Sequence, residues 1–211
     1  MATRFGFDVT AVAEIVVGSP IDPWLAIGLT ISDDVASIGG IALRFESIGD
    51  GSQAGITAWT LQGSPSTIAV IDGLRTRYTD EIVATPPVEH PLGVVSFDHL
   101  VVMTSSLERT CGAIESSTGA PLKRIREAGA VRQGFHRIGP LIVEVVETAD
   151  VRGNTAAFWG FVIVVDDIHA TADRLGPDVL APPKAAVQAG RLIASFRQEA
   201  RLGFPVALMS R

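Results

Sequence analysis

Two stretches of the sequence share one pattern, FDHLVVMTSSLERT at residues 97–110 and FWGFVIVVDDIHAT at residues 158–171. In each, a run of β-branched and other apolar residues ends at a polar pair, and a helical pattern follows. The pairs are Ser105 with Ser106 and Asp166 with Asp167, whose side-chain oxygens can cap the first turn of a helix. We therefore predict a strand followed by a capped helix twice, 61 residues apart.

Further strand candidates follow each predicted helix, which makes the repeated unit β-α-β-β-β. They lie at residues 131–138 and 141–146 in the first unit, and at residues 192–197 and 205–209 in the second. A looser copy precedes them, with strands predicted at residues 12–17, 41–46 and 56–61 and a short helix running through Leu29. Units of this length suit a few modules that pair their sheets, and they do not suit a solenoid of short repeats.

The stretch ATPPVEHPLG at residues 84–93 holds three prolines and a glycine, a composition typical of a linker. A weaker break is predicted at residues 150–154. We therefore predict three parts of the chain. They are a partial N-terminal module over residues 1–85, a linker over 86–93, and a domain over 94–211 with modules at 94–149 and 156–211.

The composition of the 211-residue chain restricts its partners. A net charge of −6 without a cluster of Lys and Arg argues against nucleic acid or an anionic membrane surface as partner. The longest apolar runs stop far short of the roughly 18 residues that span a membrane. Asp8 and Glu14 interrupt the region where a signal peptide would need an apolar core, and Cys111 is the only cysteine. We therefore expect a cytoplasmic protein without disulfides that handles a small molecule.

The strand at residues 97–102 ahead of a capped helix, the run GPLIVEVVE at residues 139–147 as a fourth strand, and the 61-residue repeat together resemble one known family. They resemble the glyoxalase-like, or vicinal oxygen chelate, superfamily, and the resemblance covers residues 94–211. It implies an α+β fold in which paired βαβββ modules form a barrel-shaped sheet around a cleft. The additional partial module lies ahead of that domain.

In metal-using members of this superfamily, each module offers one ligand from its first strand and one from its fourth. The resemblance therefore makes His99 and Glu144 the predicted catalytic and metal-ligating residues, for Zn, Fe, Mn, Ni or Co. The other half of the site is missing, because Gly160 stands where the second module would carry its histidine and residues 205–209 contain no ligand. The N-terminal copy places Ala13 there. A well-held catalytic metal needs about three protein ligands, so both a metal site and no metal remain open.

His136 is the best candidate for a third ligand, and its position depends on the turn that precedes Glu144. A three-residue turn would place His136 beside Glu144. A two-residue turn, which we favour, would instead place Gln133, Phe135 and Arg137 there.

The predicted substrate-binding residues are Arg132, Gln133, His136 and Arg191. A guanidinium group fits a carboxylate or a phosphate, and all four side chains could line the cleft. Glu144 interrupts an apolar strand, where burying an unpaired charge costs several kcal/mol. A structural ion pair with an arginine such as Arg132 is therefore the alternative to a functional role for Glu144.

Two functions of different class follow from the resemblance. The first is a divergent metal-dependent lyase, isomerase or dioxygenase that acts on an unidentified small molecule. The alternative is a metal-free protein that binds a small molecule, like the drug-sequestering members of the superfamily. The odd number of modules leaves one sheet edge without a partner, so we also expect a homodimer.

Overall fold

The computed structural model of the protein describes residues 9–47, 49, 54–63, 67–81, 86–129, 131–149, 151 and 153–211. Asp8, the first two residues of the predicted linker stretch, and Asp150 and Arg152 of the weaker break lie outside the described residues. Residues 86–93 carry no helix or strand. The division of the chain at this segment stays a prediction.

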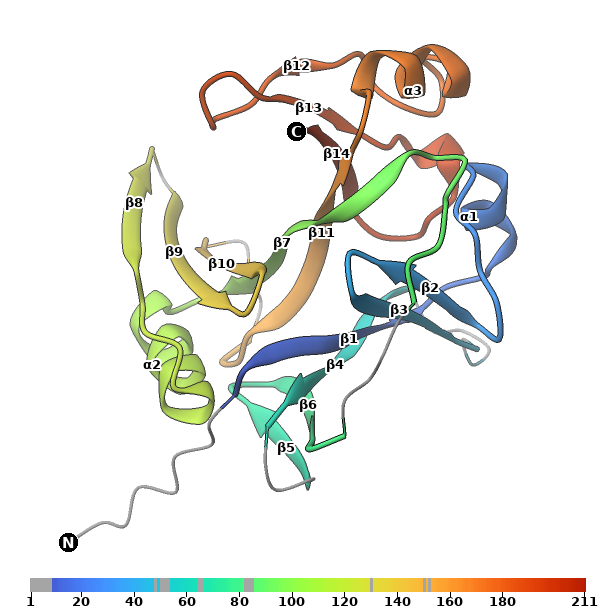
Figure 1. Ribbon diagram of the computed structural model, residues 1–211. Coiled ribbons are helices and arrows are strands. Elements are labelled where there is room, and N and C mark those ends of the chain that lie inside the picture. Colours follow the sequence, from blue (N-terminus) through green and yellow to red (C-terminus); the bar gives the residue numbers. More distant parts are fainter. Residues whose placement is uncertain are drawn as a thin grey trace, which may run out of the picture. The chain divides into compact units, whose positions relative to one another are not determined.

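The N-terminal part of the chain contributes a six-stranded sheet with the strand order β2-β3-β1-β4-β6-β5 (Figure 1). Its elements are β1 (Ala11–Gly18), α1 (Asp22–Ala26), β2 (Val35–Ile38), β3 (Ile41–Glu46), β4 (Gly55–Gln62), β5 (Thr67–Ile71) and β6 (Leu74–Thr79). The predicted strands at residues 12–17, 41–46 and 56–61 fall in β1, β3 and β4, whereas β2, β5 and β6 were not predicted. Helix α1 ends before the predicted Leu29 because Gly28 takes a φ of 97°, which a helix cannot continue.

The rest of the chain forms an eight-stranded sheet with the order β12-β13-β14-β11-β7-β10-β9-β8. The first module consists of β7 (Val94–Thr104), α2 (Leu107–Thr118), β8 (Arg124–Ala128), β9 (Val131–Ile138) and β10 (Leu141–Glu147). The second consists of β11 (Ala157–Val165), α3 (Ile168–Leu175), β12 (Lys184–Ala185), β13 (Leu192–Ser195), the 3-10 turn η1 (Gln198–Ala200) and β14 (Val206–Ser210). The predicted α+β fold of paired βαβββ modules is confirmed.

Both helices start where the capping residues predict. Helix α2 begins at Leu107 and α3 at Ile168, 61 residues later. The Ser106 hydroxyl accepts a hydrogen bond from the Arg109 backbone N–H at 3.4 Å. The Asp167 carboxylate accepts two bonds of 3.0 Å from the first backbone N–H groups of α3. Each cap satisfies donors that a helix N-terminus leaves without an intrahelical partner.

The hairpin between β9 and β10 has the favoured two-residue turn. Ile138 pairs with Leu141, so the turn is Gly139 followed by Pro140, and Gly139 supplies a φ of 59°. In this register Glu144 pairs with Phe135. The side chains of Gln133 and Glu144 therefore lie on one face of the hairpin, and that of His136 lies on the other.

The chain divides into two compact units, which are described separately. One comprises the described residues within 1–14, 57–83 and 100–159. In this unit the Thr110 hydroxyl donates to the Asp72 carboxylate at 2.5 Å, and the Tyr78 hydroxyl donates to the Ser117 carbonyl at 3.1 Å. These bonds attach the β5–β6 hairpin to α2.

The other unit comprises the described residues within 15–56, 84–99 and 160–211. Its core is an aromatic cluster in which Trp24 lies 5.5 Å from Phe45, 6.0 Å from Phe161 and 5.8 Å from Phe204, measured between ring centroids.

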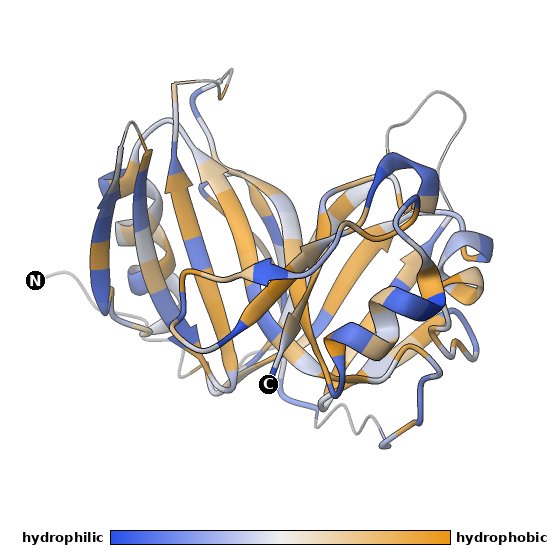
Figure 2. Ribbon diagram, turned by 90° about the horizontal axis from the view of Figure 1, so that it is seen from above, coloured by the Kyte–Doolittle hydropathy of each residue, from blue (hydrophilic) through white to orange (hydrophobic). Residues whose placement is uncertain are grey.

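In Figure 2 the central strands of the sheets are mostly hydrophobic, whereas β8, the last strand of its sheet, is mostly hydrophilic. Among the described residues, no helix combines the length and the hydropathy needed to cross a membrane.

Candidate functional site

A cluster of three charged or titratable side chains forms around Asp98 on β7. The imidazole Nδ1 of His99 lies 2.7 Å from one carboxylate oxygen of Asp98, and the Arg191 guanidinium donates to the other. Arg191 also donates to the Ser210 carbonyl at 2.8 Å and to the Gln188 side chain at 2.6 Å. The Asp98 side chain is only 7% exposed, so these bonds form in a largely dry environment.

The hydrogen bonds fix the charge of Asp98 and the tautomer of His99. Burial by itself would raise the pKa of Asp98, but hydrogen bonds from His99 and Arg191 and the nearby positive charges outweigh it, so the pKa lies below its usual value. Asp98 is therefore a carboxylate, which can only accept, and His99 Nδ1 must carry the hydrogen. In the neutral ring Nε2 then carries the lone pair, the arrangement of a hydrogen-bond acceptor or a general base.

Gln133 and Glu144 come together on β9 and β10 in the other unit. The amide nitrogen of Gln133 donates to the Glu144 carboxylate at 2.6 Å, which fixes the orientation of the amide. The amide oxygen of Gln133 is then buried without a hydrogen-bond partner among the described residues. A buried acceptor without a protein donor is a place where a ligand or an ordered water can donate.

His136 does not join Glu144. Its ring lies on the opposite face of β9 and is buried, with Nδ1 3.0 Å from the Ala120 carbonyl and no described partner for Nε2. Desolvation lowers its pKa, although the bond to Ala120 opposes the shift. His136 and Glu144 lie on opposite faces of the hairpin because the two-residue turn sets the register of β9 with β10.

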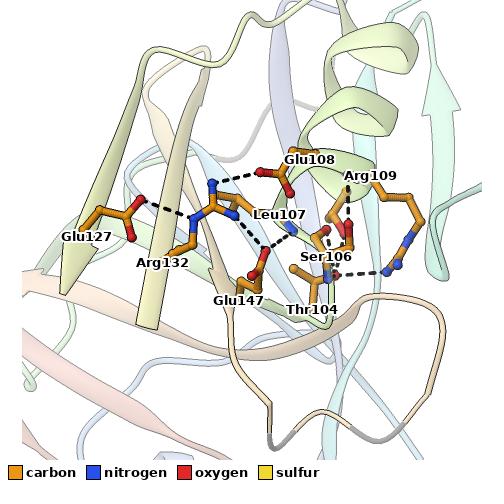
Figure 3. A network of polar contacts seen from close by, with 9 residues as sticks. Thr104, Ser106, Leu107, Glu108, Arg109, Glu127, Arg132 and Glu147 are labelled. Atoms are coloured by element: carbon orange, nitrogen blue, oxygen red, sulfur yellow. Dashed lines mark hydrogen bonds and ion pairs between the residues drawn. The ribbon is translucent and has the colours of Figure 1, made fainter. Parts of the chain in front are cut away.

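Arg132, a predicted substrate-binding residue, is engaged by three carboxylates of its own unit (Figure 3). It donates to Glu108 at 2.8 Å, to Glu127 at 3.3 Å and to Glu147 at 3.4 Å. Glu147 also accepts from the Leu107 backbone N–H at 2.6 Å, at the start of α2. The hydrogen bonds to Glu108 and Glu127 raise the pKa of Arg132, and the bond from Arg132 lowers the pKa of Glu108. The network ties β9 to β8, β10 and α2.

Solved structures of other proteins share the fold of this chain. No protein-family model and no curated protein sequence matches the chain. Among solved structures, a variant of 4-hydroxymandelate synthase from Streptomyces coelicolor is similar with a TM-score of 0.64 and 13% identity, over 96% of this chain and 93% of that chain. The fold is that of the vicinal oxygen chelate superfamily. A fusion of a xylose isomerase-like TIM barrel with 4-hydroxyphenylpyruvate dioxygenase gives a TM-score of 0.65 and 10% identity, over 100% of this chain and 50% of that chain.

The described side chains do not fit the metal site of a vicinal oxygen chelate fold. Among them, no group of three His, Cys, Asp or Glu comes close enough to hold an ion. A side chain cannot replace Gly160 without a shift of the backbone, because a Cβ there would clash with the Pro205 carbonyl. The fourth strand of the second module is apolar and buried from Val206 to Met209.

The central residue of the Asp98 cluster was not predicted from the sequence. His99 and Arg191 were predicted site residues, whereas Asp98 was not, and Arg191 lies 93 residues further along the chain. A charged residue directly before a histidine in an otherwise apolar strand was the available signal. The pairing of Asp98 with Arg191 left no such signal, because it depends on tertiary structure.

Proposed function

We propose that this protein binds a small organic molecule without a metal ion, and that the Asp98–His99–Arg191 cluster is its polar anchor. The observation that carries the proposal is the donor set, which lacks a third ligand among the described residues. His99 Nδ1 is already bonded to Asp98, so the ring is oriented without a metal. This function corresponds to the alternative from the resemblance, the metal-free binding proteins of the superfamily.

The cluster favours a ligand with a hydrogen-bond donor. The Asp98 carboxylate accepts a hydrogen bond from His99 Nδ1 and thereby fixes the orientation of the imidazole ring. Arg191 carries the compensating positive charge, since its guanidinium bonds to Asp98. We therefore propose that a hydroxyl or an acidic N–H of the ligand is bound by the Asp98–His99–Arg191 cluster.

A second candidate function is proton transfer, and the Asp98–His99 bond is the observation that favours it. A carboxylate on Nδ1 orients the imidazole and stabilises the protonated ring, which makes Nε2 an effective general base. An enzyme of this kind would remove a proton from a bound carbon or oxygen acid.

The first experiment separates metal-dependent from metal-free function. The untagged protein is analysed for metals as purified and again after incubation with Zn, Mn, Ni, Co and anaerobic Fe(II). We expect no stoichiometric metal in either case. One equivalent of metal that is lost in His99→Ala would overturn the proposal.

The second experiment tests the anchor by thermal-shift screening of small molecules with the wild type, His99→Ala and His169→Ala. His169 is the matched control because it is exposed on α3. Compounds that stabilise the wild type should lose their shift in His99→Ala and keep it in His169→Ala. Equal shifts in all three proteins would contradict a role for His99. Turnover of a stabilising compound, abolished in His99→Ala, would establish proton transfer instead of binding alone.

We also propose a homodimer, for which β5 supplies support. This strand is the last of its sheet, and Ile68 and Val70 on it are 77% and 66% exposed. Its sequence, TIAVI, has no charge or proline of the kind that protects an edge strand from pairing. Light scattering tests the proposal, and a monomer at micromolar concentration would contradict it.

A further inference from the structure

The segment between β13 and β14 lines an open cavity of about 420 Å³, which includes no residue of the Asp98 cluster or of the Gln133–Glu144 pair. Pockets for small ligands have volumes of roughly 300–1,000 Å³. The cavity lies within the unit that comprises the described residues of 15–56, 84–99 and 160–211. Its walls include two aromatic rings and a proline together with three polar side chains: Phe196, Phe204, Pro205, Arg197, Gln198 and Arg201.

The walls of this cavity are held in place by the core of the unit. The Ser19 hydroxyl donates to the Leu202 carbonyl at 3.1 Å and accepts from the Trp24 indole at 2.9 Å. Phe204 packs with its ring centroid 5.8 Å from that of Trp24 and 5.5 Å from that of Phe161. A ligand therefore meets walls that are already ordered, which reduces the entropic cost of binding.

Arg201 occupies a backbone conformation that favours glycine. Its φ is 55° and its ψ is 28°, in the left-handed region. Glycine would adopt this conformation with less strain, and the same turn already uses Gly203 with a φ of 86°. Unlike glycine, however, Arg201 places a guanidinium group at the wall of the cavity.

The polar side chains that line the cavity carry net positive charge, and most of their hydrogen-bond donors have no partner among the described residues. The Nε–H of Arg197 donates a hydrogen bond to the Pro177 carbonyl at 2.7 Å. The side chains of Arg201 and Gln198 make no hydrogen bond or ion pair with any residue that the structure describes. Among the residues that the structure describes, no acidic side chain lines the cavity, although the chain carries a net charge of −6 and Glu199 is exposed on the same turn.

We propose that this cavity binds an organic anion with a flat apolar body, a carboxylate or a phosphate monoester, and that Arg201 is its anchor. Guanidinium groups form paired hydrogen bonds with both kinds of anion. The rings of Phe196 and Phe204, with Pro205, cover the apolar body. The Gln198 amide supplies a further donor.

Thermal-shift titrations with benzoate, phenyl phosphate, inorganic phosphate and benzyl alcohol test the proposal. Benzoate or phenyl phosphate should raise the melting temperature in a concentration-dependent manner. Inorganic phosphate lacks the apolar body and benzyl alcohol lacks the charge, so both should bind at least about tenfold more weakly. Binding of inorganic phosphate as tight as that of phenyl phosphate would overturn the role of the apolar walls. Binding of benzyl alcohol as tight as that of benzoate would overturn the role of the charge, and no binding of either anion would overturn the proposal.

Substitutions at Arg201 separate a ligand-binding role from a structural one. Arg201→Gln should weaken anion binding by about tenfold or more. Arg201→Gly should remove the same interaction while raising the melting temperature of the free protein, because it relieves the left-handed backbone. The matched control is Arg75→Gln, at an exposed arginine on β6, which should leave anion binding unchanged. Unchanged anion binding in Arg201→Gly would show that the guanidinium is not the anchor.

Discussion

The two βαβββ modules of the eight-stranded sheet have the same order of elements but differ in their chemistry. Their first strands end, and their helices begin, 61 residues apart. The first module carries Asp98 and His99 on its first strand and Glu144 on its fourth. The second has Gly160 on its first strand and only apolar residues from Val206 to Met209 on its fourth.

The comparison shows that the fold and the site depend on different residues. Caps and buried apolar side chains keep both modules alike, whereas a few polar positions separate them. At Gly160 packing accounts for the difference, because the Pro205 carbonyl occupies the space of a side chain. The second module instead contributes Arg191, which bonds to Asp98 as a cation.

The largest expected effect comes from giving the second module the histidine that it lacks. Gly160→His should lower the free energy of unfolding by about 3 kcal/mol or more, because the new Cβ would displace the Pro205 backbone. Urea unfolding measures the effect. Gly112→Ala is the control, since a Cβ on that glycine of α2 has open space and should not destabilise the protein. A stable Gly160→His variant that takes up a metal would contradict the conclusion that packing explains the difference between the modules at this position.

Removal of the Asp98 charge should have the next largest effect. Asp98→Asn leaves Arg191 without its carboxylate and should cost about 2 kcal/mol or more at pH 7. The folded pKa of Asp98 is lowered, so its contribution is present above the unfolded pKa of about 4 and is lost as the pH falls through the folded value. The difference between wild type and variant should therefore shrink in acid.

Thermal unfolding between pH 7 and pH 3 checks this prediction. Asp173→Asn, at an exposed aspartate of α3, provides the control and should not show the loss of stability expected of Asp98→Asn at pH 7. A constant difference between wild type and Asp98→Asn over the whole range would contradict the assigned ionisation of Asp98.

The helix caps offer the smallest and most direct test of the likeness between the modules. Asp167→Ala removes a charged cap with two hydrogen bonds of 3.0 Å and should cost about 1–2 kcal/mol. Ser106→Ala removes one bond of 3.4 Å and should cost about 0.5 kcal/mol. Denaturation of both single variants and the double variant measures the effects, which should add. A larger loss in Ser106→Ala would reverse the expected order.

Much of the fold was predictable because its signals are local. The capping residues marked the starts of α2 and α3, and the turn at Gly139 and Pro140 set the register of β9 with β10. The strands β8 and β12 carried no comparable signal, since their few residues are largely polar. They form because neighbouring strands supply the hydrogen bonds that their own sequences do not predict.

The sequence by itself determined which residues repeat and where the helices begin, and it favoured the register that places Gln133 on the same face as Glu144. Capping and strand alternation act between residues that are close in the chain, so they can be read without a structure. Only the tertiary structure decided that Arg132 serves a carboxylate network, that Arg191 holds Asp98, and that Arg201 lines a cavity. An arginine has several donors and a long side chain, so its partner depends on which distant segments the fold brings within reach.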